Sequence, residues 1–222
     1  MAVDKNSQGI EYMQQGKYEE AAKIFNEMIE ENPNDPIPYI NFGNLLAAVG
    51  EEARAIAFFN KALEIDGKLG TAYYGAGNIY YKKGDFLKAK DNFEQAIKHG
   101  LQEADAYFML GMSLSQLGQA KLSLPYFQRA IELNNLDEDA HFQYGLSLAL
   151  LEMVDEAIPY FEKTIELNEE HTDAYYNLGV AYAFKDQPEK ALEMFNKALQ
   201  IQPDHFLAGN GKKKMEELLQ QH

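Results

Sequence analysis

The residue types that most often carry out catalysis occur in this chain without the spacing that catalysis requires. The sequence contains five histidines, at His99, His141, His171, His205 and His222. None of them stands in the paired spacing of a zinc motif. The motif Gly75-Ala76-Gly77 lies within a helical pattern and follows no strand, which argues against a dinucleotide-binding loop. We therefore expect no metal site, no cofactor and no enzymatic activity.

The amino-acid composition excludes further kinds of catalysis and of binding partner. Cysteine is absent, which excludes thiolate catalysis and disulfide bonds and suits a reducing cytosol. Acidic residues are abundant, but they follow solvated helix faces and form no pocketed pair suited to acid–base catalysis. The formal net charge of −15 argues against a nucleic acid or an anionic membrane as the partner, because both require clustered Lys and Arg. The basic run Lys212-Lys213-Lys214 is predicted to be a solvated helix end.

Hydropathy indicates a soluble protein. The first residues read MAVDKNSQGIEYM and place Asp4 where a signal peptide needs an apolar core. No apolar run approaches the roughly 18 residues of a membrane span. Hydrophobic residues make up 46% of the chain and charged residues 25%, values typical of a folded protein. We expect a cytoplasmic location and no membrane partner.

A repeat of 34 residues provides the main evidence on the fold. Glycines occur at this interval at Gly9, Gly43, Gly77, Gly111, Gly145 and Gly179. A phenylalanine follows each of them by sixteen residues, at Phe25, Phe59, Phe93, Phe127, Phe161 and Phe195. A second series has the same interval, at Gly16, Gly50, Gly84 and Gly118, and continues as Glu152 and Asp186. Self-similarity at a fixed period predicts a stacked array of small units.

Each unit holds two amphipathic stretches. In the third unit, apolar or small residues recur at helical spacing on both sides of the turn Lys83-Gly84-Asp85, which predicts an αα-hairpin. Gly77 lies in the middle of the first stretch, where a glycine costs about 1 kcal/mol relative to alanine. We expect Gly77 to face the small residue Ala89, so that the two helices of the hairpin approach closely and the aromatic side chains fill the space between hairpins.

This pattern resembles the tetratricopeptide repeat (TPR) family, whose units combine two helices in a 34-residue frame. The first helices read YINFGNLL, YYGAGNIY, YFMLGMSL, HFQYGLSL and YYNLGVAY, with His141 in a core aromatic position. YINFGNLL and ALEMFNKALQIQPDH are also similar to small stand-alone members from Gram-positive bacteria. The resemblance implies an all-α, right-handed superhelical solenoid.

Six repeats account for most of the chain. Their expected bounds are 2–35, 36–69, 70–103, 104–137, 138–171 and 172–205, within one solenoid over residues 1–222. Residues 206–222 are predicted to form a capping helix, whose apolar start (Phe206, Leu207 and Ala208) covers the last hairpin and whose end is polar. Gly209 and Gly211 are expected to weaken the start of this helix.

The resemblance also implies a concave groove, lined by residues of the first helices at fixed distances from the mid-helix glycine. The first group of groove residues consists of the amides Asn41, Asn44 and Asn78, which can both donate to and accept from a peptide backbone. The second group is largely apolar and comprises Tyr74, Phe108, Met109, Met112, Phe142, Leu146, Tyr176, Asn177 and Val180. An acidic rim is formed by Asp105, Asp139 and Asp173. Alternatively, the aromatic residues pack against neighbouring helices, the asparagines are solvated and the aspartates favour helix N-termini.

Together these observations predict a monomeric scaffold that binds a peptide or helix of a partner protein in its groove. The family's best-known mode, a clamp for a C-terminal carboxylate, is disfavoured because only Asn41 matches its residues. A dedicated chaperone or assembly factor for one client, a regulatory subunit of an enzyme complex and a self-associating structural module remain as alternatives.

Overall fold

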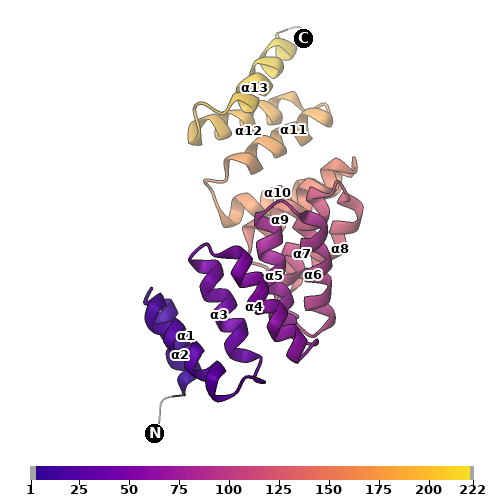
Figure 1. Ribbon diagram of the computed structural model, residues 1–222. Coiled ribbons are helices and arrows are strands. Elements are labelled where there is room, and N and C mark those ends of the chain that lie inside the picture. Colours follow the sequence, from indigo (N-terminus) through magenta and orange to yellow (C-terminus); the bar gives the residue numbers. More distant parts are fainter. Residues whose placement is uncertain (1–3, 221–222) are drawn as a thin grey trace. The chain divides into compact units, whose positions relative to one another are not determined.

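The computed structural model describes residues 4–220, and every regular element in that range is a helix (Figure 1). The helices of the first half are α1 (Lys5–Gln14), α2 (Tyr18–Glu31), α3 (Ile37–Ala48), α4 (Glu52–Ile65), α5 (Gly70–Lys82), α6 (Phe86–Lys98) and α7 (Ala104–Gln116). Those of the second half are α8 (Ala120–Leu133), α9 (Glu138–Leu150), α10 (Val154–Leu167), α11 (Thr172–Phe184), α12 (Pro188–Ile201) and α13 (Phe206–Leu219). The chain forms two compact units, Met1–Ser113 and Leu114–His222, whose boundary falls within α7.

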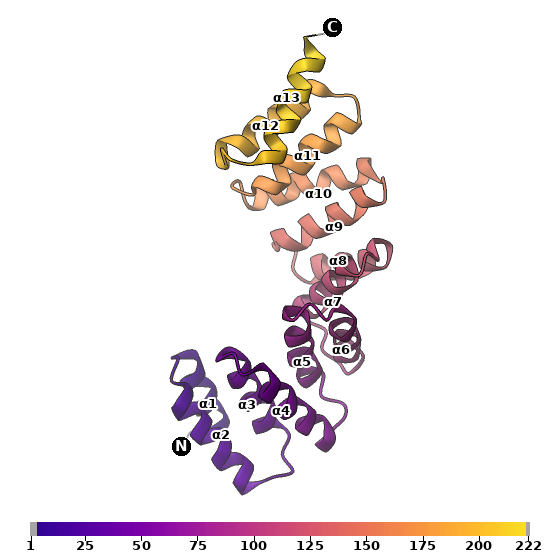
Figure 2. The ribbon, with the colours of Figure 1, turned by 45° about the horizontal axis from the view of Figure 1, so that its top comes forward.

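Consecutive helices pair as hairpins within each unit (Figure 2). The predicted turn between α5 and α6 is confirmed, since α5 ends at Lys82 and α6 begins at Phe86. Gly84 adopts a φ of 76° there, in the left-handed region that only glycine enters without strain. At the equivalent position of the last two hairpins, Glu152 and Asp186 adopt φ values of 61° and 56°. The turn geometry is therefore kept even where a side chain makes it unfavourable.

The mid-helix glycines are explained by phenylalanine rings. A Cβ atom on Gly77 would lie 2.8 Å from Cε1 of Phe93, and the three nearest atoms all belong to that ring. The expectation that Gly77 faces Ala89 was therefore wrong. Phe93 is fully buried, and its ring lies against the bare backbone of the first helix in its own hairpin. The period links glycine to phenylalanine because the two residues share one contact.

A second glycine contact joins neighbouring hairpins in the first unit. The Phe59 ring lies beside Gly43 of its own hairpin and Gly75 of the next, where added Cβ atoms would lie 2.7 and 2.4 Å from ring carbons. Phe59 has no exposed surface. The ring is thus enclosed between two backbones, and α5 packs closely onto the α3–α4 hairpin.

Helix α13 packs on the last hairpin through only one of the three apolar residues expected, Ala208. Ala208 and Met215 are buried with Phe195, and a Cβ on Gly211 would lie 2.7 Å from Cζ of that ring. Phe206 and Leu207 are 76% and 53% exposed. The expectation that they cover the hairpin was wrong, because the buried face of the helix follows the spacing of Ala208, Gly211 and Met215. Gly211 permits this close approach.

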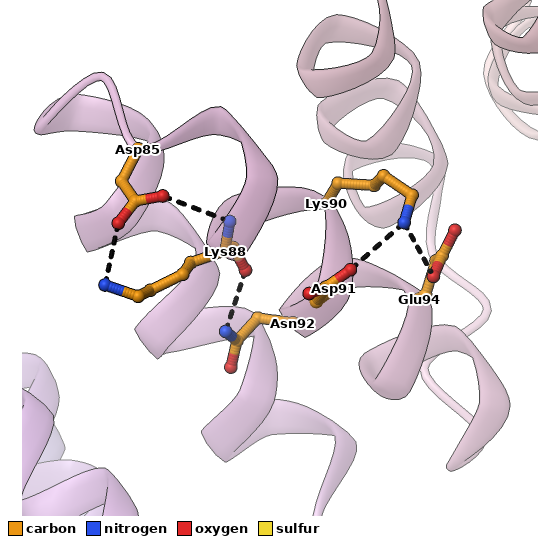
Figure 3. Close-up of polar contacts among 6 residues, drawn as sticks. All are labelled: Asp85, Lys88, Lys90, Asp91, Asn92 and Glu94. Carbon is orange, nitrogen blue, oxygen red and sulfur yellow. Dashed lines mark hydrogen bonds and ion pairs between the residues drawn. The ribbon is translucent and has the colours of Figure 1, made fainter. Parts of the chain in front are cut away.

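Charged residues pair along the outer surface, as the α6 hairpin illustrates (Figure 3). The Asp85 carboxylate accepts the backbone N–H of Lys88 at 3.3 Å and its side-chain ammonium at 2.8 Å. Lys90 bridges Asp91 at 3.0 Å and Glu94 at 3.4 Å. These are local, solvent-facing pairs, each of which contributes little to stability. Within residues 4–220, no helix is both long and apolar enough to cross a membrane.

Candidate functional site

Two of the predicted groove amides meet at one cavity in the first unit. The cavity has a volume of about 160 Å³ and is lined by Asn44, Ala47, Glu52, Phe59, Gly75, Asn78, Ile79 and Lys82. We call it the amide cavity. Asn44 is exposed and Asn78 is half-buried. Both amide groups are therefore placed where an incoming chain could reach them.

The repeat itself places these amides together. Asn44 and Asn78 each follow a mid-helix glycine, and they occupy the same position in consecutive repeats. Helices α3 and α5 are in contact, so equivalent positions on them face the same side of the unit. Gly75 lacks a side chain, so its backbone packs directly against the buried Phe59 ring at the floor of the cavity. The floor is apolar, whereas the wall carries hydrogen-bonding groups.

A charge pair forms the rest of the wall. The Glu52 carboxylate lies 3.1 Å from Nζ of Lys82 and 3.7 Å from Nζ of Lys83. The hydrogen bond from Lys82 is the main reason that the pKa of Glu52 lies below its ordinary value. Glu52 therefore stays ionised and paired, and the net charge that the cavity presents to a ligand is small.

Tyr74 connects the cavity to the core. Burial raises the pKa of its phenol, while a hydrogen bond with the Asn78 side chain acts in the opposite direction. Its ring packs against Phe93 with centroids 5.7 Å apart. The phenol therefore stays protonated at neutral pH and lies near the side chain of Asn78, one helical turn further along α5.

The third predicted amide has a different setting. Asn41 is half-buried and donates a hydrogen bond from Nδ2 to Oδ1 of Asn6 on α1, at 2.5 Å. It does not line the amide cavity. A ligand that used Asn41 would have to compete with this contact between the first two hairpins.

The remaining candidates in the first unit lie on α7. Phe108, Met109 and Met112 are half-buried, and Asp105 is exposed. The methionines offer flexible apolar surface of the type that adapts to varied side chains.

The second unit holds the other predicted groove residues, several of which already make contacts. Phe142 is only 8% exposed and packs against Phe161 and His171, with ring centroids 6.0 and 4.5 Å apart. Tyr176 packs against Phe195 and His205 at 6.0 and 5.3 Å. Phe142 therefore leaves little surface for a partner.

The polar and aliphatic candidates of this unit are more accessible. Leu146 is half-buried and Val180 is 42% exposed. Asn177 donates from Nδ2 to the carbonyl of Asp173 at 2.8 Å. Asp139 is exposed, whereas Oδ1 of Asp173 lies 3.2 Å from Nε2 of His205. Part of the predicted acidic rim thus interacts with the start of α13.

His141 occupies the core position predicted for it. It is 6% exposed, stacks on Tyr160 with centroids 6.0 Å apart, and its Nε2 lies 3.1 Å from the carbonyl of Asn135. No group of three or more His, Asp or Glu side chains within residues 4–220 is arranged to hold a metal ion.

Sequence reasoning missed most of the residues that line the amide cavity, among them Lys82, Glu52 and Phe59. Lys82 lies four residues after Asn78, so helical spacing could have indicated it. Glu52 and Phe59 lie on α4, a second helix of a hairpin, and contribute through tertiary packing. No local signal in the sequence identifies them.

Comparisons with known proteins agree with this architecture. Models of the tetratricopeptide repeat match residues 12–77, 74–135, 108–153, 138–171 and 172–205. The crystal structure of YrrB, reported as a TPR protein with an unusual peptide-binding site, is 53% identical, with a TM-score of 0.82 over 85% of this chain and 97% of that one. A crystal structure of MamA protein is 26% identical, with a TM-score of 0.72 over 77% of this chain and 93% of that one. The TPR repeat-containing protein YrrB of Bacillus subtilis (strain 168) is 62% identical over 39 residues, which span 18% of this chain and 19% of that relative.

Proposed function

This chain belongs to the tetratricopeptide repeat family, and we propose that it is a protein-interaction scaffold whose amide cavity holds the backbone of a partner peptide. Asn44, Asn78 and Gly75, which all line the amide cavity, form the centre of the binding site. Phe108, Met109 and Met112 provide apolar contacts in the same unit. The role is binding without catalysis.

The convergence of Asn44 and Asn78 on one cavity is the observation that carries this proposal. A carboxamide offers two N–H donors and one carbonyl acceptor. Two such groups from consecutive repeats can pair with the N–H and C=O groups of an extended segment, whatever its side chains are. The peptide-binding site reported for YrrB supports a peptide as the class of ligand.

We expect the affinity of the amide cavity for a peptide to depend only weakly on salt concentration. The amides are neutral, and Glu52 is already paired with Lys82. Loss of one amide that pairs with a buried backbone group costs about 1–3 kcal/mol, because the group on the partner is left unsatisfied. Each amide thus changes affinity by about fivefold to more than a hundredfold. A partner that reached the exposed Asp105 or Asp139 would add an attraction that salt screens.

The test begins with affinity capture of the partner from native cell extract, with the Asn44→Ala/Asn78→Ala double variant as the comparison bait. Calorimetry on the captured partner then measures Asn44→Ala, Asn78→Ala and Phe108→Ala. We expect each of the three substitutions to weaken binding, while the helical signal in circular dichroism is unchanged. Asn60→Ala is the matched control, since Asn60 is an exposed amide on α4 that does not line the cavity.

One pattern of results would refute the proposal. If the Asn44, Asn78 and Phe108 variants bind as tightly as the unmodified protein, while Asn60→Ala weakens binding, the partner uses the second-helix face instead.

A further inference from the structure

One helix–helix turn in the second unit is unusually apolar. The turn between α9 and α10 reads Leu150-Leu151-Glu152-Met153. The corresponding residues of the other hairpins read QQGK, AVGE, KKGD, QLGQ and FKDQ. Leu150 is 74% exposed and Met153 is 39% exposed, although neither is needed to form the turn.

Residues of the preceding hairpin extend this apolar surface. Two surface cavities, of about 470 and 440 Å³, lie where the α7–α8 turn and the start of α8 meet the α9–α10 turn. Their apolar lining includes Leu122, Leu124, Leu150, Leu151 and Met153, which we call the Leu150 patch. Leu122 is 57% exposed. Clustered exposed apolar residues of this kind mark interaction sites on proteins.

Lys121 gives the patch a charge. It lines both cavities and is the single charged residue among the described residues that line them. No hydrogen bond or ion pair joins its ammonium group to another residue in the range 4–220. Asp155, at the start of α10, is already paired with Lys185. An unpaired cation beside leucines favours a ligand that brings a carboxylate next to its own apolar side chains.

The equivalent surface of the first two hairpins can be compared with the Leu150 patch. A cavity of about 250 Å³ lies at the equivalent place between the first two hairpins and is lined by residues that include Glu19, Val49, Glu51 and Arg54. Glu19 there corresponds to Lys121, three 34-residue periods later, and Glu51 corresponds to Met153. Arg54 pairs with Glu51 at 3.7 Å. The combination of leucines and an unpaired lysine is thus not a consequence of the repeat.

We infer that the Leu150 patch binds a short segment of another protein that carries two apolar side chains and an adjacent carboxylate. Leu122 and Leu150 contact the apolar side chains, and Lys121 pairs with the carboxylate. A second copy of this chain is disfavoured as the occupant, because each copy carries a formal net charge of −15 and the copies repel one another. This site is separate from the amide cavity.

Selection from a library of random displayed dodecapeptides on the full chain tests this inference. We expect a class of peptides that contain two apolar residues and an Asp or Glu. Leu150→Ser should weaken their binding by about tenfold or more, the effect of losing one buried leucine. Lys121→Glu should reverse the preference and favour peptides in which Lys replaces the acid. Val49→Ser at the equivalent turn is the matched control and should have no effect.

The outcomes separate this site from the amide cavity. Peptides of the expected class should bind the Asn44→Ala/Asn78→Ala variant unchanged. The inference is wrong if no acidic, apolar class is enriched, or if every enriched peptide binds the Leu150→Ser variant as well as the unmodified chain. It is also wrong if the chain self-associates in sedimentation experiments and Leu150→Ser abolishes that association, since the occupant would then be a second copy. Because Leu150 is 74% exposed, we expect Leu150→Ser to leave the fold intact. An unchanged thermal unfolding midpoint of this variant checks that the fold is retained.

Discussion

Replacement of Gly75 by alanine tests the packing that shapes the amide cavity. An added Cβ atom would lie 2.4 Å from Cζ of Phe59, whereas ordinary contacts are at 3.4–4 Å, so about 1 Å of movement is needed. The ring cannot simply retreat, because it has no exposed surface and also packs against the backbone of Gly43, where an added Cβ atom would lie 2.7 Å from Cε1. The strain must therefore separate α5 from the α3–α4 hairpin.

The change in the free energy of unfolding caused by Gly75→Ala results from two opposing effects. Overpacking of this kind costs about 1–3 kcal/mol. Alanine in a helix recovers about 0.5–1 kcal/mol relative to glycine. Gly209→Ala is the matched control, because a Cβ there meets no atom within 4 Å, so the only expected effect is the higher helix propensity of alanine. The difference between the two variants isolates overpacking, with Gly75→Ala less stable by about 1–3 kcal/mol.

Urea unfolding monitored by circular dichroism measures this difference. With a slope of about 2 kcal/mol per molar urea, the two midpoints should differ by about 0.5–1.5 M. Gly209→Ala should unfold at slightly higher urea than the unmodified chain. If Gly75→Ala is stabilised to the same extent as Gly209→Ala, the contact between Gly75 and Phe59 does not limit packing, and the account of the cavity floor fails.

Three further predictions concern charge and the helix ends. Hydrogen bonds from Lys88 hold the pKa of Asp85 below its ordinary value of 3.8, so ionised Asp85 stabilises the folded state above that pH. This stabilisation is lost as the pH falls through the lower folded-state pKa. The difference in urea midpoint between the unmodified chain and Asp85→Asn should therefore shrink below about pH 4. His205→Ala should lower stability by about 1 kcal/mol in urea unfolding, because Nδ1 of His205 accepts the N–H of Ala208 at 3.0 Å and caps α13, whereas His205→Asn should retain most of it. Deletion of residues 206–222 should expose Phe195 and cause self-association in sedimentation experiments; a fully monomeric truncated chain would contradict a capping role for α13.

The period in the sequence predicted the elements well because the same contacts recur. Gly9, Gly43, Gly77, Gly145 and Gly179 each pack against a phenylalanine ring, and each turn has a residue with a left-handed φ, so both features produce a regular spacing in the sequence. The partner of Gly77 was predicted wrongly because a linear pattern cannot distinguish the small Ala89 from the larger Phe93 on the same helix face. Only the packed structure shows that the ring reaches the glycine.

The end of the array was predicted less well. Phe206 and Leu207 are apolar, which suggested burial, but the buried face of α13 is set by the fit of Gly211 to the Phe195 ring. At this contact, shape outweighs hydrophobicity. A similar limit applies to Asn41, because the sequence shows an amide but not its hydrogen bond to Asn6.

Variation among the repeats separates residues needed for packing from residues free to bind. A phenylalanine follows each mid-helix glycine by sixteen residues in all six repeats, and each of the six is buried. The position after the glycine varies, from Asn44 and Asn78 to Val180, and Asn44 and Val180 are both exposed. Since packing leaves this position unconstrained, two consecutive asparagines that share one cavity are better explained by a ligand than by stability. The same reasoning applies to the Leu150 patch, where the turn geometry is kept but its residues are replaced by leucines.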